Sequence, residues 1–210
     1  GNCNDDVFCL SQTRDEAQLL EWSGDIGSDI SVFFSEGAAY CTGRGEIVED
    51  VEPPIPLDTP MLLVKPNIGL STPGEFIFNS VWAIVVTHVL FTAIFKALDL
   101  DSRSTEDPLD LLQKITSQGK CEDAICVNDL EAPAFSKLPE LQALKDKLRG
   151  AGTSGVSSVF MSGSGSTIVQ VGSDVVPEFV REDEALFRSP ARLITRKRGE
   201  WYKPSGLWKK

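Results

Sequence analysis

Alternating serine and glycine residues occupy positions 162–166 of this 210-residue chain. They separate two apolar stretches, 159–161 and 167–169, that are rich in β-branched residues. Glycine lacks the Cβ that would keep the backbone away from a ligand, and it adopts positive φ freely. Successive N–H groups and serine hydroxyls can then bind an anion. A tight turn between two strands has a similar composition. The local pattern therefore leaves phosphate binding and a simple turn open.

The cysteine and histidine content argues against a metal centre. The chain has five cysteines, Cys3, Cys9, Cys41, Cys121 and Cys126, and one histidine. An odd number of cysteines at irregular spacing does not suggest a disulfide framework and favours a reducing compartment. Cys121 and Cys126 have no matching second pair, so we expect no zinc site.

The charge is acidic and unevenly distributed. The formal net charge is −11, which argues against a general nucleic-acid binder. Residues 195–210 carry six Lys or Arg and one acidic residue, so the end of the chain is a basic tail. With 41% hydrophobic and 24% charged residues, the composition is that of a globular protein. The chain starts at Gly1 with no initiator methionine and no signal or transit peptide, and we interpret it as a fragment.

The pattern of apolar residues, glycines and prolines predicts an α+β protein. Pro53, Pro54, Pro56 and Pro60 form a stiff connector between two parts. Helices are predicted at 15–22, 108–117 and 140–148, a strand–turn–strand unit at 37–48, and strands at 61–65, 156–161 and 167–171. Residues 30–34 fit a strand or the start of a helix, and residues 185–195 fit a helix or a strand.

The twenty residues 76–95 contain no charge and do not follow the pattern of their surroundings. Their length and hydropathy meet the minimum for a membrane span. Five polar residues within the run and the absence of flanking basic clusters argue against a span, and a buried core segment is the alternative. His88 lies inside this run and receives no chemical role.

Three separated motifs resemble, in this order, the second half of a GHMP-family small-molecule kinase. They are Gly27-Ser28-Asp29-Ile30 with Phe33-Phe34, then Gly43-Arg44-Gly45-Glu46, then Ser162-Gly163-Ser164-Gly165-Ser166. Residues 64–66, 71–72, 127–131 and 200–203 agree as well. Within the family the resemblance is closest to the plant and bacterial branch that acts on 4-diphosphocytidyl-2-C-methyl-D-erythritol. It covers about residues 14–75 and 95–204, and the family's long Gly-rich ATP loop has no counterpart in the chain.

The resemblance implies roles for several residues. Asp29 would be the catalytic base, although Ser28-Asp29 also fits a simple helix N-cap. Gly163, Ser164, Gly165 and Ser166 would lie beside the phosphates of ATP, and Ser71 and Thr72 would border the substrate. ATP and Mg²⁺ would be the cofactors, with no metal-ligating residue expected in this chain. Asn128 and Asp129 are interpreted as caps of the helix that follows them.

The resemblance also implies a domain plan and a function. Residues 1–57 would be the remnant of an N-terminal ATP and substrate domain. Residues 58–195 would be a ferredoxin-like α+β C-terminal domain, followed by the basic tail 196–210. The apolar insert 76–94 is interpreted as translated intron or an annotation error, with a genuine insertion as the alternative, to be tested by genomic and transcript reads. The expected reaction is ATP-dependent phosphorylation of the 2-hydroxyl of the small-molecule substrate in the plastid stroma. A homodimer is compatible with this reading, whereas nucleic-acid and membrane partners are not expected. Another GHMP kinase, a non-catalytic fragment and a membrane-anchored protein are the alternatives.

Overall fold

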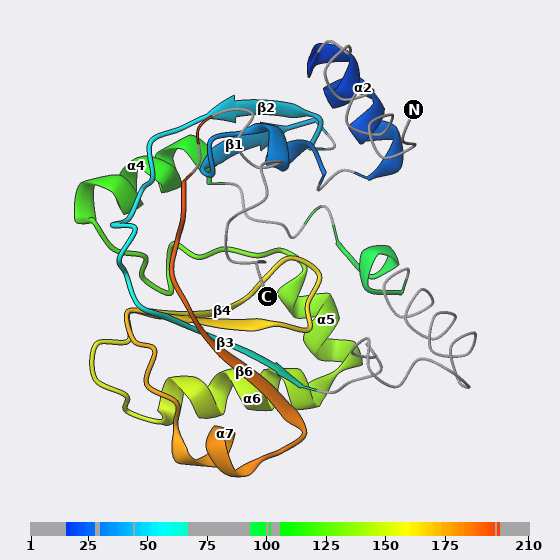
Figure 1. The fold of residues 1–210 in the computed structure, drawn as a ribbon. Helices are drawn as coiled ribbons and strands as arrows, with labels where there is room; N and C mark the ends of the chain where they lie inside the picture. The colour runs from blue at the N-terminus through cyan, green and yellow to red at the C-terminus, as the bar shows by residue number, and fades with distance from the viewer. Residues whose placement is uncertain are drawn as a thin grey trace, which may run out of the picture. The chain divides into compact units, whose positions relative to one another are not determined.

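The computed structural model describes residues 16–27, 30–43, 45–66, 93–99, 101, 106–195 and 197 (Figure 1). The chain divides into two compact units. The smaller unit takes in residues 1–53 and 194–210, and the larger takes in residues 54–193. The domain plan drawn from the sequence, with divisions after residues 57 and 195, stays a prediction.

The smaller unit contains a helix, a 3-10 turn and a β-hairpin. Helix α2 (Glu16–Ile26) covers the predicted helix and extends beyond it by one turn. The apolar stretch at 30–34 forms the 3-10 helix η1 (Ser31–Phe34), so the strand alternative is wrong there. Strands β1 (Ala39–Thr42) and β2 (Ile47–Asp50) pair antiparallel. The predicted strand–turn–strand unit is therefore confirmed.

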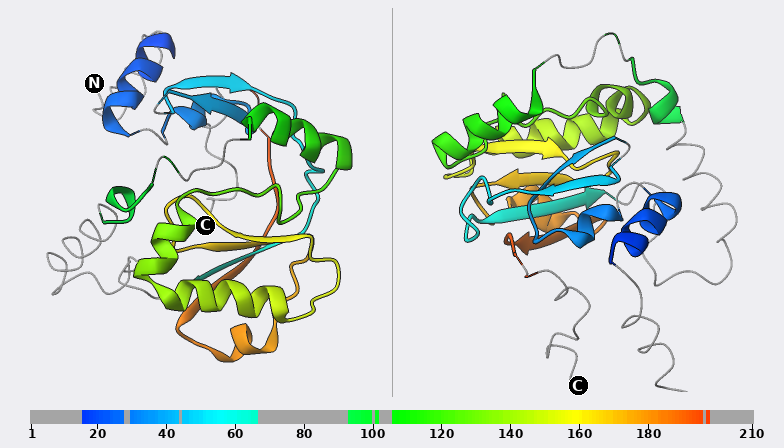
Figure 2. Two further views of the ribbon diagram at one scale, coloured as in Figure 1. Left: turned by 180° about the vertical axis from the view of Figure 1, so that it is seen from behind. Right: turned by 90° about the horizontal axis from the view of Figure 1, so that it is seen from above.

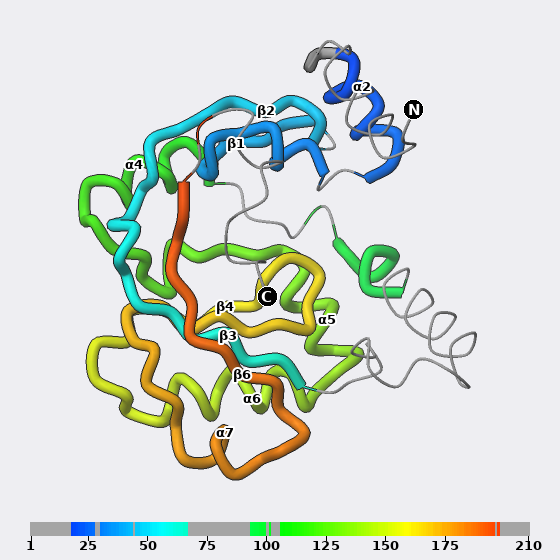
Figure 3. Tube along the Cα trace, in the orientation of Figure 1, coloured from blue at the N-terminus to red at the C-terminus, as the bar shows by residue number. Residues whose placement is uncertain are grey.

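The larger unit is built on a four-stranded antiparallel sheet. Its strands are β3 (Met61–Pro66), β4 (Ser158–Met161), β5 (Ile168–Val171) and β6 (Leu186–Ala191). Their order is β4-β5-β3-β6, so β4 and β6 are the edges. The predicted strands at 61–65, 156–161 and 167–171 are confirmed, and the ambiguous 185–195 stretch contains a strand. Figure 3 traces the chain through these strands.

The larger unit also contains α4 (Pro108–Gln118), α5 (Glu131–Lys137), α6 (Pro139–Gly150) and the short α7 (Glu178–Glu182). Local sequence explains the ends of α4. The Asp107 carboxylate accepts a hydrogen bond from the Leu109 N–H at 2.8 Å, which caps the first turn. Gly119 ends the helix with φ of +65°. The predicted helices at 108–117 and 140–148, and the predicted α+β class, are confirmed.

The main core lies between the sheet and α6. Leu141, Leu144 and Leu148 of α6 are spaced i, i+3 and i+7, and all three are buried. Figure 2 shows α5 and α6 against one face of the sheet. The sheet and other segments contribute Leu62, Val64, Ile94, Ala134, Val159, Met161, Ile168 and Val180 to the same cluster. Burial of each large apolar side chain contributes about 1.5–3 kcal/mol.

Most of the apolar run 76–94 lies outside the described residues. Its last residue, Ile94, belongs to a helical turn at 93–96 and is buried in the main core with 1% exposure. Within the described ranges, no helix is both long enough and apolar enough to cross a membrane. The interpretation of the run as translated intron stays a hypothesis.

One expectation about the cysteines is wrong. Cys121 and Cys126 form a disulfide, with their Cα atoms 6.6 Å apart. The N–H groups of Ile125 and Cys126 both donate to the Glu122 carbonyl, and this turn brings the two cysteines together. Spacing statistics do not reveal such a local turn. Cys41 is exposed and unpaired.

Candidate phosphate-binding site

The Ser/Gly stretch forms the connection between β4 and β5. The Ser162 N–H donates to the Thr167 carbonyl at 2.9 Å, and the Gly165 N–H donates to the Ser162 carbonyl at 3.0 Å. Gly163 and Gly165 have φ of +53° and +89°. L-residues rarely adopt these values, so the glycines let the chain reverse within a few residues. The turn alternative therefore describes the geometry, while phosphate binding stays a prediction.

A buried hydroxyl in this loop has unused hydrogen-bonding capacity. Ser166 is 3% exposed, and its Oγ has no hydrogen-bond partner among the described residues. Leaving a buried hydroxyl unsatisfied costs about 1–3 kcal/mol. By contrast, Ser162 and Gly163 are exposed at the loop tip. The loop thus combines accessible backbone with a buried hydroxyl that makes no hydrogen bond within the described residues.

Two side chains hold the end of β4 next to the loop: Asn128, which lies just before α5, and Glu131, the first residue of α5. The Asn128 Nδ2 donates to the carbonyls of Met161 at 2.9 Å and Gly163 at 2.7 Å. The Glu131 Oε1 accepts the Met161 N–H at 2.7 Å. Asn128 also accepts the Leu130 N–H through Oδ1, at 3.0 Å, which forms a local Asx turn. The N-cap position of α5 is Leu130, which makes no side-chain capping bond, so the predicted capping role of Asn128 and Asp129 is wrong. Its contacts with the loop were not predicted, because 33 and 35 residues separate the partners in sequence.

Glu131 belongs to an ion pair that is largely shielded from solvent. Its Oε2 lies 2.6 Å from the Lys145 Nζ, and the two side chains are only 17% and 11% exposed. The Lys145 ammonium also lies 5.7 Å from the centre of the Phe135 ring, within range of a cation–π interaction. Lys145 reaches from α6 to the first residue of α5, so the pair joins these two helices.

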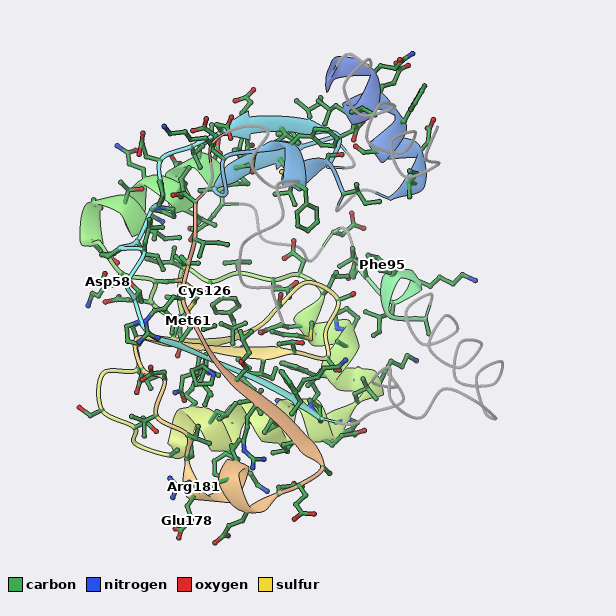
Figure 4. All side chains as sticks on the ribbon, viewed as in Figure 1. Asp58, Met61, Phe95, Cys126, Glu178 and Arg181 are labelled. Carbon is green, nitrogen blue, oxygen red and sulfur yellow. A yellow bond between two sulfur atoms is a disulfide. The ribbon has the colours of Figure 1, made fainter. Side chains whose placement is uncertain are left out.

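A cavity of about 890 Å³ lies between residues 97–99 and 123–145 and is lined by both members of this ion pair. Its charged lining consists of Asp99, Asp123, Asp129, Glu131 and Lys145. Cys126, labelled in Figure 4, also lines it. Asp123 is paired outside the lining, with Arg149 at 2.9 Å. The cavity is therefore mainly acidic, and the Ser/Gly loop stays the predicted phosphate site of this unit.

The described residues include only part of the predicted site. Gly163, Ser164, Gly165 and Ser166 lie together in the β4–β5 loop. Asp29, Ser71 and Thr72 lie outside the described residues, so their roles stay predictions. Sequence reasoning missed Glu131 and Lys145. Glu131 lies in the stretch 127–131 that agrees with the family, but no role was assigned to it. Lys145 gave no signal, since charged residues on amphipathic helices are normally solvent-facing.

Comparison with known protein families finds a match to part of the larger unit. Residues 109–191, from α4 to β6, match the family model described as the C-terminal domain of GHMP kinases. Residues 109–191 are a GHMP kinase C-terminal domain. The family resemblance stated from the sequence is confirmed. This GHMP kinase domain includes the Ser/Gly loop together with Asn128, Glu131 and Lys145.

The curated relatives are plant and bacterial kinases. The chain is 50% identical over 190 residues to the 4-diphosphocytidyl-2-C-methyl-D-erythritol kinase, chloroplastic/chromoplastic, of Solanum lycopersicum, covering 89% of this chain and 42% of that protein. It is 48% identical over 191 residues to the chloroplastic kinase of the same name from Arabidopsis thaliana, covering 90% of this chain and 45% of that protein. The chain therefore spans less than half the length of these relatives.

A solved structure has the same fold. A crystal structure of 4-(cytidine 5'-diphospho)-2C-methyl-D-erythritol kinase matches with a TM-score of 0.55 and 20% sequence identity. The match covers 88% of this chain and 60% of the solved one. This likeness is one of fold.

Proposed function

We propose that this chain forms part of a 4-diphosphocytidyl-2-C-methyl-D-erythritol kinase. Such an enzyme transfers the γ-phosphate of ATP to the 2-hydroxyl of its substrate. The main support is the 48–50% identity to plant enzymes of that name over about nine-tenths of the chain. Because the chain covers 42–45% of those enzymes, the reaction is proposed for the full-length protein.

In this proposal Asp29 accepts the proton of the substrate 2-hydroxyl while the hydroxyl oxygen attacks the γ-phosphorus. The bond from the γ-phosphorus to the bridging oxygen breaks, and ADP leaves. Ser71 and Thr72 border the substrate. The loop Gly163–Ser166 contributes N–H and hydroxyl donors to the ATP phosphates. The Ser166 Oγ, buried and without a hydrogen-bond partner among the described residues, supports this role of the loop.

Magnesium would neutralise charge on the phosphates during transfer. Among the residues that the structure describes, no three His, Cys, Asp or Glu side chains come together to hold a metal ion. Mg²⁺ in proteins commonly retains waters and binds through substrate phosphates. We therefore propose that it enters as the ATP complex, held by phosphate oxygens.

Location and assembly follow from the same proposal. The relatives from Arabidopsis thaliana, Mentha piperita and Oryza sativa are named as chloroplastic, which supports the plastid stroma as the site of action. The proposed partner is the small-molecule substrate, without nucleic acid or membrane. A homodimer is the proposed assembly, to be checked by light scattering.

The test is ADP release by the full-length protein with 4-diphosphocytidyl-2-C-methyl-D-erythritol and MgATP. Asp29→Asn is expected to lower kcat about 100-fold or more with little change in KM. Asp58→Asn, at an exposed site in the connector, serves as the control and should leave kcat unchanged. Full activity of Asp29→Asn would overturn the assigned base. A preference for mevalonate or homoserine would overturn the assigned substrate.

A further inference from the structure

We propose that Asn128 is a positioning residue for the Ser/Gly loop, and that its carboxamide holds the loop backbone in the conformation that binds phosphate. The second half of this statement rests on the proposed function. The first half, that Asn128 orders the loop, stands on the hydrogen bonds alone.

The contacts of Asn128 define which way its amide points. Nδ2 faces the two carbonyls of Met161 and Gly163, and Oδ1 faces the Leu130 N–H. A flipped amide would set its oxygen against two carbonyl oxygens and its nitrogen against an N–H. Three hydrogen bonds therefore lock the side chain in one orientation, across a helix start, a strand end and a loop tip.

The bond to Gly163 also orients the peptide that follows it. In a planar trans peptide the carbonyl and the next N–H point in opposite directions. Because the Gly163 carbonyl accepts from Asn128, the Ser164 N–H points away from Asn128. An anion on that side of the loop would meet this N–H. The side chain thus fixes the direction of a donor that it does not itself touch.

Gly163 gives the backbone at the loop tip conformational freedom, and the hydrogen bond from Asn128 restricts it. A Cβ placed on Gly163 would meet no heavy atom within 4 Å, so neighbouring side chains do not confine this residue. Its φ of +53° is one of several regions open to glycine. The turn bond from the Gly165 N–H to the Ser162 carbonyl brackets this residue, and the 2.7 Å bond from Asn128 adds a restraint on the Gly163 carbonyl itself.

Side chains of the segment 123–131 provide hydrogen-bond partners for the outer edge of strand β4. The Asp123 Oδ1 accepts the Val159 N–H at 2.8 Å, and the Glu131 Oε1 accepts the Met161 N–H at 2.7 Å. With the Met161 carbonyl bound by Asn128, side chains replace a further strand along this edge. The strand end is therefore fixed independently of Asn128, and loss of Asn128 should loosen the loop while β4 stays in place.

Two substitutions separate the bonds of Asn128 to the loop side from its local bond to the Leu130 N–H. Asn128→Asp keeps the oxygen that accepts the Leu130 N–H but loses both donors to the loop side, and Asn128→Ala loses both functions. Asp107→Ala is the matched control, because it removes the cap of α4 and has no contact with the loop. All three are made in the 210-residue chain.

The first measurement is the ¹⁵N order parameter of Gly163 and Ser164 without ligand. We expect about 0.8 in the wild type and below about 0.6 in both Asn128 variants, with β5 unchanged. Asp107→Ala should match the wild type at the loop. An ordered loop in Asn128→Asp would overturn the inference, whatever happens to nucleotide binding.

The second measurement is the dissociation constant for MgATP, from chemical shifts of the loop amides. Both Asn128 variants should bind about tenfold more weakly than the wild type and the control. A loosened loop with unchanged affinity would overturn the claim that its conformation matters for phosphate. A loosened loop in a chain whose wild type does not bind MgATP would support Asn128 as the positioning residue and contradict the proposed function of the loop.

Discussion

Substitution of Lys145 by methionine should destabilise the larger unit far more than the same substitution at an exposed lysine, because Lys145 is buried on α6. Methionine retains the length of the aliphatic stem but removes the ammonium that lies 2.6 Å from Glu131. The Glu131 carboxylate, only 17% exposed, would then keep the Met161 N–H as its hydrogen-bond donor. It would be a mostly buried charge without a counter-ion.

The expected cost follows from this geometry. Removing one partner of a fully buried ion pair costs about 3–5 kcal/mol. The remaining exposure of both side chains, and the cavity beside them, lower the expected loss of unfolding free energy to about 2–3 kcal/mol. In a Glu131→Gln background the side chain is neutral and still accepts the Met161 N–H. Lys145→Met should then cost less than about 1 kcal/mol, which predicts a coupling energy of about 2 kcal/mol.

The assay is urea unfolding of four proteins: the wild type, Lys145→Met, Glu131→Gln and the double variant. Unfolding is followed by the amide resonances of β5, which report on the larger unit. Lys114→Met is the matched control, since its ion pair with Glu106 has side chains 51% and 54% exposed. It should change stability by less than about 0.5 kcal/mol. Equal losses for Lys145→Met and Lys114→Met would refute the reasoning, because burial would then make no difference to the pair.

Three other predictions test separate features of the larger unit. Gly172→Ala should cost about 3 kcal/mol or more in urea unfolding, because its φ is +93° and its Cβ would lie 2.1 Å from a backbone carbonyl oxygen. Gly150→Ala, whose Cβ meets open space, should be neutral or stabilising by up to about 1 kcal/mol, and equal effects would contradict the model of a steric clash. Cys121→Ser should lose about 2 kcal/mol through opening of a loop with sequence separation 5, and this loss should vanish when both proteins are measured in dithiothreitol. The hydrogen bond from Arg192 holds the pKa of the Asp174 carboxyl below its ordinary value. This contact therefore stabilises the fold at pH values above the ordinary pKa, and the stabilisation is lost as the pH falls through the pKa of Asp174 in the folded state. Arg192→Gln should raise the Asp174 pKa in an NMR titration, and an unchanged midpoint would show that another group causes the shift.

Local sequence patterns were sufficient to predict most of the helices and strands that the structure describes. The hairpin in the smaller unit, helix α4 and the strands on both sides of the Ser/Gly loop could all be predicted from residues adjacent in sequence. Periodicity, proline and glycine act over one turn or one strand, so their effect is visible without knowledge of the fold. The family resemblance depended on the order of such local motifs, and for that reason it too could be read from the sequence.

Two features were not predicted. The Cys121–Cys126 bridge depends on the local turn at Glu122, which cysteine spacing alone does not reveal. The contacts of Asn128 with the loop depend on packing, because 33 and 35 residues separate the partners in sequence.

The ion pair and the support of the loop arise where α5, α6 and β4 come together. Glu131 contacts Met161 across 30 residues of sequence and Lys145 across 14. Contacts at such separations are set by which faces of helices and strands are buried together, and a charged residue on a helix has the same local signature whether it faces solvent or a partner. The position of the Ser/Gly turn between two strands could therefore be predicted from the chain itself, and its phosphate-binding role stays a prediction. The side chains that hold the loop became visible only when the three elements were packed.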